Sequence, residues 1–314
     1  MKVGKLYFAG RFMVAKSKKL VVVAGPTAVG KTATAIRIAQ HFYTEIISAD
    51  SRQIFKELTI GTAKPDEVEL AAVPHHFINS HTISQQYDAA TFATEALAVI
   101  QNLFLKNDHV ILCGGSGLYI KALCDGFDDI PAVDENIRKG LVSKFEALGI
   151  EWLQHEMERL DPEHYKTLDK LNPHRLIRAL EIKIGTGNSI ASYRTNSKRK
   201  HDFDIVKIGL TLPREVLYER IDLRMDKMIE AGLFQEAKEM LPFEQHQALQ
   251  TVGYQEIFGY FHGAYDKEEA IRLLKRNSRH YAKRQLTWFK RDEEFKWFQP
   301  TQLDDILHHI NSYK

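Results

Sequence analysis

The segment VVVAGPTAVGKTAT, residues 21–34, constrains the fold more than any other part of this chain. It passes from an apolar run, typical of a buried strand, into a helical pattern through the octet GPTAVGKT. That octet fits G-x-x-x-x-G-K-[ST], in which loop N–H groups and the start of the next helix surround a phosphate. Lys31 adds a mobile positive charge, and the Thr32 hydroxyl can bind Mg²⁺. The predicted phosphate-binding residues are Gly25, Pro26, Thr27, Ala28, Val29, Gly30, Lys31 and Thr32.

Short apolar strands alternate with helical patterns around this octet. The expected strands are Leu20–Ala24, Glu45–Ser48, Val110–Cys113 and Phe203–Leu210. The expected helices include Lys31–His41, Ala89–Leu105, one from Leu118, one from Pro213 and Ala270–Arg291, and the stretch from Gly61 to His76 is expected to be rich in loops. Such alternation indicates a parallel sheet that is covered on both faces. We therefore predict an α/β fold, a P-loop NTPase-like doubly wound parallel sheet.

The alternation is interrupted in the middle of the chain. From Asp134 to about Gly185 every segment has a helical pattern, and a strand pattern returns only at Phe203. We expect a helical insertion domain at residues 126–200, a catalytic core at 20–125 and 201–314, and an N-terminal extension at 1–19. The basic segment TNSKRKH, residues 195–201, is expected to be an exposed hinge.

Composition excludes several classes of protein. The longest apolar runs are shorter than the 18 or so residues that a membrane span needs, so no membrane association is expected. The basic N-terminus lacks the apolar region of a signal peptide, which favours a cytoplasmic enzyme. Cys113 and Cys124 both lie in apolar surroundings and are expected to be buried thiols. The net charge of +2 does not by itself indicate a nucleic-acid partner.

Two further segments are expected at the edge of the sheet where the phosphate loop lies. Asp50 follows the second strand, and ligands gather beyond the carboxyl ends of parallel strands. Its carboxylate could act as a general base or hold Mg²⁺ through water. It could equally be a helix N-cap that accepts from the N–H groups of Gln53 or nearby residues. Ser116 offers a hydroxyl in a second glycine-rich turn, CGGSG, after the third strand.

A basic stripe near the C-terminus points to a polyanion. The segment Arg272–Arg291 holds eight Lys or Arg residues and no Asp or Glu, with aromatic residues between them. Such a stripe suits phosphate contacts and base stacking, although a solvated helix face is the alternative. Arg220 and Arg224 lie one helical turn apart, and either could reach the phosphate site or pair with an acid on its own helix.

The order of six segments identifies a resemblance. The segments are GPTAVGKT, SADSRQIFKELTIGTAKP, GGSGLYIKAL, NPHRLIRALEI, QTVGYQEI and AKRQLTWFKR. Together, over roughly residues 20–292, the chain resembles the bacterial tRNA dimethylallyltransferases, also called tRNA isopentenyltransferases. The resemblance implies transfer of a dimethylallyl group from dimethylallyl diphosphate to N6 of adenosine 37 in tRNA, assisted by Mg²⁺. It implies that the phosphate loop holds the donor's diphosphate, that the insertion grips the tRNA anticodon stem-loop, and that the enzyme is a monomer.

The resemblance also assigns residues to roles. Asp50 corresponds to the general base and Arg224 to a catalytic arginine near the diphosphate, while Lys31, Thr32 and Thr27 complete the catalytic set, with Thr32 on the metal. The positions implied to contact tRNA are Asp50, Ser51, Arg52, Gln53, Ser116, Arg138, His174, Arg175, Arg178, Gly253, Tyr254, Lys283, Arg284 and Gln285.

Three alternative functions are compatible with parts of the sequence. A small-molecule kinase would use the same loop to bind ATP, because nucleotides are the commonest ligands of this motif. A non-enzymatic RNA-binding protein would account for the basic stripe but not for the loop, Asp50 and Arg224 together. Prenyl transfer to a free adenosine phosphate would leave the stripe and the large insertion without a purpose.

Overall fold

The computed structural model describes residues 17–195 and 197–313. The described chain divides into two compact units. The core unit contains the residues up to Cys124 and from Lys200 onward, and the insertion unit is Asp125–Arg199. The sequence-based boundaries, 126 and 200, each differ from these by one residue. Most of the expected N-terminal extension, residues 1–16, lies outside the described residues, and Lys19 belongs to the first strand rather than to an extension.

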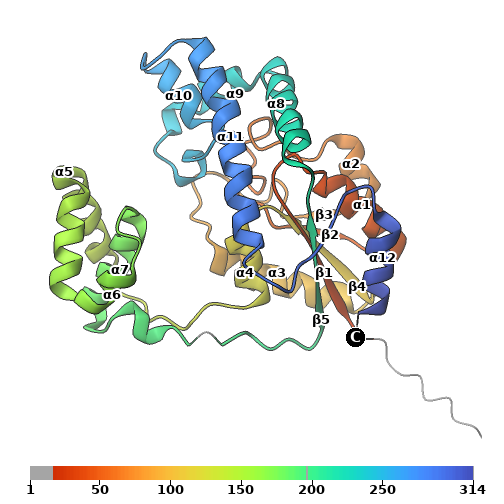
Figure 1. The fold of residues 1–314 in the computed structure, drawn as a ribbon, viewed down its shortest axis with the longest axis horizontal. Helices are drawn as coiled ribbons and strands as arrows, with labels where there is room; N and C mark the ends of the chain where they lie inside the picture. The colour runs from red at the N-terminus through yellow and green to blue at the C-terminus, as the bar shows by residue number, and fades with distance from the viewer. Residues whose placement is uncertain (1–16, 196, 314) are drawn as a thin grey trace, which may run out of the picture. The chain divides into compact units, whose positions relative to one another are not determined.

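A parallel sheet forms the centre of the core unit (Figure 1). Its six strands are β1 (Lys19–Ala24), β2 (Ile46–Ser48), β3 (His75–His76), β4 (His109–Gly114), β5 (Asp204–Leu210) and β6 (Lys296–Phe298). They lie in the order β3-β2-β4-β1-β5-β6, and every pair is parallel. All six residues of β1 are buried, as expected for a central strand that is covered on both faces. The predicted α/β fold is therefore confirmed.

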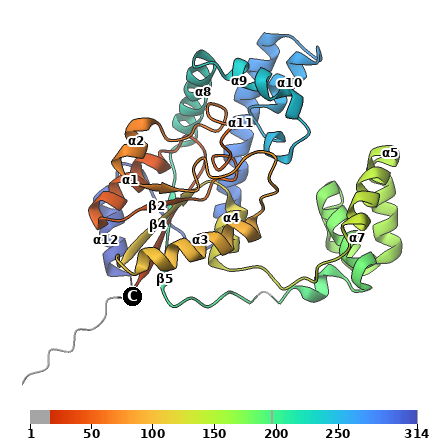
Figure 2. The same ribbon diagram turned by 180° about the vertical axis from the view of Figure 1, so that it is seen from behind.

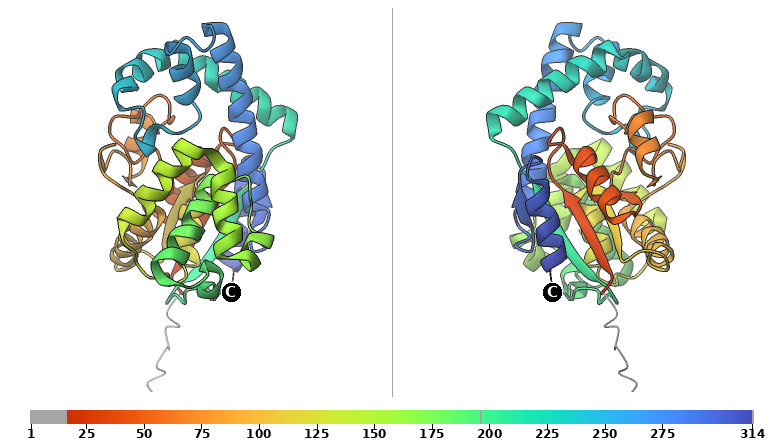
Figure 3. Two further views of the ribbon diagram at one scale, coloured as in Figure 1. Left: turned by 90° about the vertical axis from the view of Figure 1, so that its left-hand side faces the viewer. Right: turned by 90° about the vertical axis from the view of Figure 1, so that its right-hand side faces the viewer.

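Helices cover both faces of this sheet. The core-unit helices are α1 (Lys31–Phe42), α2 (Glu67–Ala72), α3 (Ala89–Phe104), α4 (Gly117–Cys124), α8 (Arg214–Glu230), α9 (Leu233–Met240), α10 (Gln255–Phe261), α11 (Lys267–Phe289) and α12 (Leu303–Ser312). The helices α3 and α4 lie on one face of the sheet (Figure 2). Their side chains, such as Phe92 and Leu123, pack against the strands there. Side chains of α1, α8 and α12, such as Ile38 and Ile306, pack on the other, where α1 and α12 face the viewer in the right-hand panel of Figure 3.

A third apolar cluster forms beyond the sheet. It joins the loop after β2 to α8, α9 and α10 through residues such as Phe55, Leu58, Leu233 and Tyr254. This cluster places a loop from the N-terminal half of the chain against helices from the C-terminal half. It forms one wall of the cavity described below.

The insertion unit is helical, as the sequence predicts. Its elements are α5 (Glu135–Leu160), α6 (Pro162–Thr167), α7 (Pro173–Thr186) and the 3-10 turn η1 (Ile190–Tyr193). The helix α5 bends at Gly149, where φ is 77°. Asn172 caps α7 by accepting from the N–H of Arg175 at 3.3 Å, and Pro173 occupies its first turn. Leu153, Met157 and other apolar residues of the three helices form a core of their own.

Several elements were not expected from the sequence, among them the helices α9 and α10. The stretch expected to be loop-rich contains the short helix α2 and the two-residue strand β3. A capping box between Asp66 and Glu69 stabilises α2, in which each side chain bonds to the other residue's N–H. The strand β6 and the helix α12 follow the last predicted helix, where no element is expected.

The basic segment 195–201 is exposed except at its last residue, which is half-buried, and Asn196 lies outside the described residues. The C-terminal part of the segment bonds to nearby backbone, because Arg199 N–H donates to the carbonyl of Asp125 and the ring of His201 bonds to the carbonyl of Cys124. Across the described residues, no helix is both long and apolar enough to cross a membrane.

Candidate active site

A cavity of about 600 Å³ lies in the core unit, at the carboxyl ends of β1, β2 and β4. The phosphate loop, the loop after β2, and helices α8 and α11 contribute to its lining. Eleven of the predicted site residues line it together, namely Thr27, Ala28, Gly30, Lys31, Thr32, Asp50, Arg52, Gln53, Arg224, Gly253 and Gln285. Segments up to 258 residues apart in the chain thus meet in one site.

The phosphate loop has the backbone shape that its glycines allow. Gly25 and Gly30 have φ of 153° and 108°, values that favour glycine, and Gly30 precedes the first residue of α1. The loop therefore ends at a helix N-terminus, where unpaired N–H groups attract anions. Lys31 Nζ donates to the carbonyl of Pro26 at 2.8 Å, so the lysine folds back over the loop.

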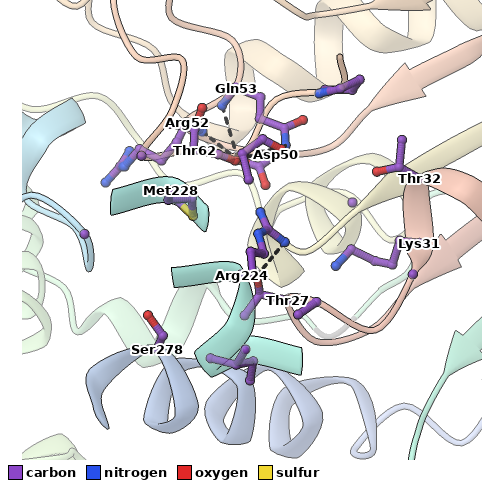
Figure 4. A pocket seen from close by; sticks show the side chains of 18 of the residues that line it. Thr27, Lys31, Thr32, Asp50, Arg52, Gln53, Thr62, Arg224, Met228 and Ser278 are labelled. Carbon is purple, nitrogen blue, oxygen red and sulfur yellow. Dashed lines mark hydrogen bonds between the residues drawn. The ribbon is translucent and has the colours of Figure 1, made fainter. Parts of the chain in front are cut away.

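Two cationic side chains extend into the same space, Lys31 from α1 and Arg224 from α8 (Figure 4). Arg224 Nη1 donates to Thr27 Oγ1 at 3.3 Å, which ties the arginine to the phosphate loop. The pKa of Lys31 is lowered to about 8, mainly by burial, with the neighbouring charge of Arg224 adding to the decrease and the negative charge of Asp50 opposing it. Burial also lowers the pKa of Arg224. Two positive charges held this close in a partly buried site attract an anion with more than one negative charge.

Asp50 lines the same cavity as Lys31 and Arg224 (Figure 4). Its carboxylate also caps the turn that follows it. Its Oδ1 accepts from the N–H groups of Arg52 at 2.9 Å and Gln53 at 3.3 Å. The expected bond to the N–H of Gln53 is therefore present, but residues 51–54 form a turn rather than the start of a helix. This capping role does not exclude the functional one. Both bonds go to Oδ1, so among the described residues Oδ2 is the carboxylate oxygen that remains for a substrate.

Gln285 links the two glycine-rich turns. Its side chain, 7% exposed, accepts from Thr27 N–H at 2.8 Å through Oε1 and donates to the carbonyl of Gly115 at 3.0 Å through Nε2. Nearby, Ser116 Oγ accepts from the N–H of Ser51 at 2.9 Å, which joins the second turn to the loop after β2. Gln285 and Ser116 thus bind backbone groups inside the protein.

Tyr254, which the resemblance places in contact with tRNA, is fully buried. Its hydroxyl donates to Glu236 Oε1 at 2.6 Å. In this conformation the side chain supports the cavity wall from behind, whereas the neighbouring Gly253 lines the cavity. A direct contact between the Tyr254 side chain and a ligand in the cavity is therefore not compatible with this structure.

The basic stripe on α11 is less uniform than its sequence suggests. Arg272 pairs with Glu269 on its own helix, and both Arg279 Nη1 contacts with Asp222 are shorter than 2.9 Å. Lys283 and Arg284 lie further along the helix and are exposed, with the guanidinium of Arg284 over the ring of Tyr281 at 5.7 Å. The part of the stripe best placed for a polyanion is thus its C-terminal part.

Four predicted tRNA contacts lie in the insertion unit, and all four are exposed. They are Arg138, His174, Arg175 and Arg178. Arg138 and Arg178 both donate to the same oxygen of the buried Glu181, each at 3.1 Å. One carboxylate balances only part of this charge, so this surface can still attract phosphate groups. The assignment of these residues to tRNA contact stays a prediction.

The sequence did not point to Glu236, whose carboxylate holds the loop after β2 through several hydrogen bonds. Its position after the Gly232 turn in an ordinary amphipathic helix gives no local signal. Only the partners, which lie about 175 residues earlier in the chain, distinguish it.

Known proteins resemble this chain over nearly its whole length. The model of the IPP transferase family matches residues 53–292. The tRNA dimethylallyltransferase of Cytophaga hutchinsonii is 50% identical over 94% of this chain and 97% of its own length. That of Christiangramia forsetii is 51% identical over 90% of this chain and 94% of its own length.

Solved structures agree with the sequence relatives. The tRNA isopentenylpyrophosphate transferase of Bacillus halodurans has a TM-score of 0.69 with 38% identity, covering 94% of this chain and 96% of that one. A eukaryotic dimethylallyltransferase acting on tRNA has a TM-score of 0.76 with 27% identity, covering 92% of this chain and 75% of that one. The matched family model, the identity of the relatives and the shared fold lead to one conclusion: the chain belongs to the IPP transferase family.

Proposed function

We propose that this chain transfers a dimethylallyl group from dimethylallyl diphosphate to N6 of adenosine 37 in the tRNA anticodon stem-loop, with release of diphosphate. The observation that carries the proposal is a cavity in which the phosphate loop, two half-buried cations and the Asp50 carboxylate meet. The names of its relatives, the tRNA dimethylallyltransferases, specify the transferred group and the acceptor. The reaction would take place where tRNA is, in the cytoplasm.

The cationic side of the cavity suits a departing diphosphate. When the C–O bond of the allylic donor breaks, negative charge builds up on the diphosphate oxygens. Loop N–H groups, Lys31 and Arg224 are already oriented toward the space where that charge would develop. Charge stabilisation by groups that need not reorganise accounts for a large part of many enzymatic rate enhancements.

Asp50 suits the acceptor. The N6 amine of adenine is a poor nucleophile, because its lone pair is delocalised into the ring. A carboxylate oxygen that accepts one N6 proton would orient the amine and take the proton as the new C–N bond forms. Asp50 Oδ2 would take this role, since Oδ1 is held by two backbone N–H groups.

The site also fits Mg²⁺ held mainly by the donor. Among the described residues no three His, Cys, Asp or Glu side chains are grouped as a metal site. Mg²⁺ is commonly bound by one or two protein oxygens together with phosphate oxygens and waters. The Thr32 hydroxyl, which lines the cavity, would be its protein ligand. When bound, the ion would neutralise part of the diphosphate charge.

The acceptor base must leave the anticodon loop to reach this cavity, because a stacked base is shielded by its neighbours. The exposed Lys283 and Arg284 on α11, together with the four exposed residues of the insertion unit, would supply phosphate contacts to the stem-loop. We also propose that the chain binds tRNA as a monomer.

Mass analysis of nucleosides tests the function. Purified protein is incubated with tRNA, Mg²⁺ and dimethylallyl diphosphate, and the digested tRNA is examined for N6-isopentenyladenosine. A parallel incubation with labelled ATP and candidate metabolites tests the kinase alternative. Isopentenyladenosine at position 37 supports the proposal, whereas label transferred from ATP with no prenylated nucleoside would refute it.

A further inference from the structure

We propose that Glu236 is a positioning residue, which holds the Asp50 carboxylate in its working orientation through the loop at residues 59–63 and the side chain of Gln53. The inference rests on the proposed function, because it assigns Asp50 to the reaction. Glu236 lies on α9 and is not part of the proposed catalytic set. Its side chain acts through backbone groups of another segment rather than on a substrate.

The first link is an unusually complete set of donors to one carboxylate. Glu236 Oε2 accepts from the N–H groups of Thr59 at 3.0 Å and Ile60 at 2.7 Å. Its Oε1 accepts from Gly61 N–H at 2.8 Å and from the Tyr254 hydroxyl at 2.6 Å. Three successive N–H groups that converge on one anion form a nest, which fixes the backbone direction of the loop.

The second link joins the loop to Gln53. The carbonyls of Thr62 and Ala63 follow directly after the nest and accept from Gln53 Nε2 at 3.2 and 3.1 Å. The direction of these two carbonyls depends on the backbone that Glu236 fixes. Gln53 also contributes its N–H to Asp50 Oδ1, together with the N–H of Arg52. The path from Glu236 to Asp50 therefore consists entirely of hydrogen bonds and two short backbone segments.

Apolar packing alone would not set this orientation. Phe55 and Leu58 anchor the loop in the apolar cluster with Leu233 and Tyr254. Such contacts are non-directional, so they hold the loop near the cavity wall without fixing its N–H and carbonyl groups. At Gly61 the Tyr254 ring lies so close that an added Cβ would be 2.5 Å from a ring carbon. The Glu236 carboxylate fixes the orientation of the backbone N–H groups in this closely packed loop.

Glu236→Gln is the primary test. The amide keeps one acceptor oxygen but turns an NH₂ group toward backbone N–H donors. We expect kcat to fall about tenfold, as when an interaction needed in the transition state is lost, with the KM for dimethylallyl diphosphate within about twofold of wild type. Glu239→Gln is the matched control, because Glu239 is exposed on the same helix and accepts from Gln235. Its kinetics should equal those of wild type.

Hydrogen exchange gives a readout that does not depend on activity. In Glu236→Gln, exchange at the amides of Thr59, Ile60 and Gly61 should accelerate because they lose their acceptor. If the path is real, the amides of Arg52 and Gln53 should accelerate as well. Faster exchange confined to residues 59–61, with kcat within twofold of wild type, would show that Glu236 only pins a loop and would overturn the proposal.

Gln53→Leu interrupts the path at its second link and leaves Glu236 intact, so it provides a test if the first variant is too unstable to study. It should reproduce the loss of kcat and the faster exchange at Arg52, without faster exchange at Thr59. The double variant should lose about as much activity as the worse single variant, whereas multiplied losses would overturn the shared path. A wild-type protein with no prenyl transfer would refute the proposed function instead, and the exchange pattern would still test the path.

Discussion

Gln285→Leu gives the sharpest test of how the phosphate loop is held. Leucine is close to glutamine in size, so the substitution mainly removes the two hydrogen bonds of the amide, at 2.8 Å to Thr27 N–H and 3.0 Å to the carbonyl of Gly115. A hydrogen bond of this kind contributes about 1 kcal/mol net, so the two together contribute about 2 kcal/mol. Lost from transition-state binding, that energy corresponds to about a 30-fold lower kcat/KM.

The assay varies dimethylallyl diphosphate at saturating tRNA and then tRNA at saturating donor. In the proposed function the loop would contact the diphosphate in both the ground state and the transition state, so we expect the loss mainly as a higher KM for the donor. Gln235→Leu, the same change at an exposed glutamine of α9, is the control. Gly115→Ala should resemble Gln285→Leu, because its Cβ would lie 2.4 Å from Gln285 Nε2.

The thermal midpoint separates a catalytic effect from a general loss of stability. A loss of about 2 kcal/mol lowers the melting temperature by only about 3 °C in a protein of this size, so the folded enzyme can still be assayed. A lower melting temperature with an unchanged donor KM would show that the amide merely fixes α11 in place. The bridge between the two turns would then have no part in binding the donor.

Three further predictions concern charged groups of the site. Asp50→Ala should lower kcat by about 10²- to 10⁴-fold while the tRNA Kd changes little, and equal losses in both would argue for a purely structural carboxylate. Lys283→Ala should reduce the slope of log Kd for tRNA against log salt by about 1, whereas Arg279→Ala should change it less, because Asp222 already pairs with that arginine. Equal slope changes in titrations of the two variants would contradict the pairing. With the pKa of Lys31 near 8, its charged form is lost as pH rises, so calorimetric affinity for the donor should fall above about pH 8 in wild type but not in Lys31→Arg. If the affinity for the donor does not change between pH 7 and pH 9.5, the charge that binds the donor is not that of Lys31.

The parts of the fold that could be predicted from sequence are those with a local signal. The phosphate loop carries its own pattern, and the placement of Asp50 follows from the rule that parallel strands end at one edge of a sheet. The strands β3 and β6 have only two and three residues, too few to show a period, and each lies at an edge of the sheet. They form because β2 and β5 offer unpaired edges, which is a property of the folded sheet.

The roles of individual side chains were harder to predict than the elements that carry them. Helical spacing placed Arg279 in a basic stripe, but its partner Asp222 lies 57 residues earlier and could not be inferred from that spacing. Gln285 was grouped with exposed neighbours, whereas packing of α11 turns it inward. Which face of a helix is buried at a given turn depends on the helices around it, and no local pattern contains that information.

The residues of the candidate site come from both ends of the chain, so the helices after the insertion are needed to complete its geometry. The phosphate loop and the loop after β2 come from the first 65 residues, and a sheet fixes such loops only at their ends. Their middle sections are held by Glu236 of α9 and Gln285 of α11, each through backbone N–H groups of the earlier segment. Because these contacts span more than 170 residues, they can form only after both halves of the core unit have folded together. The anion-binding loop and the carboxylate can therefore reach their final geometry only when the C-terminal helices are in place, although the sequence motifs that identify them lie near the N-terminus.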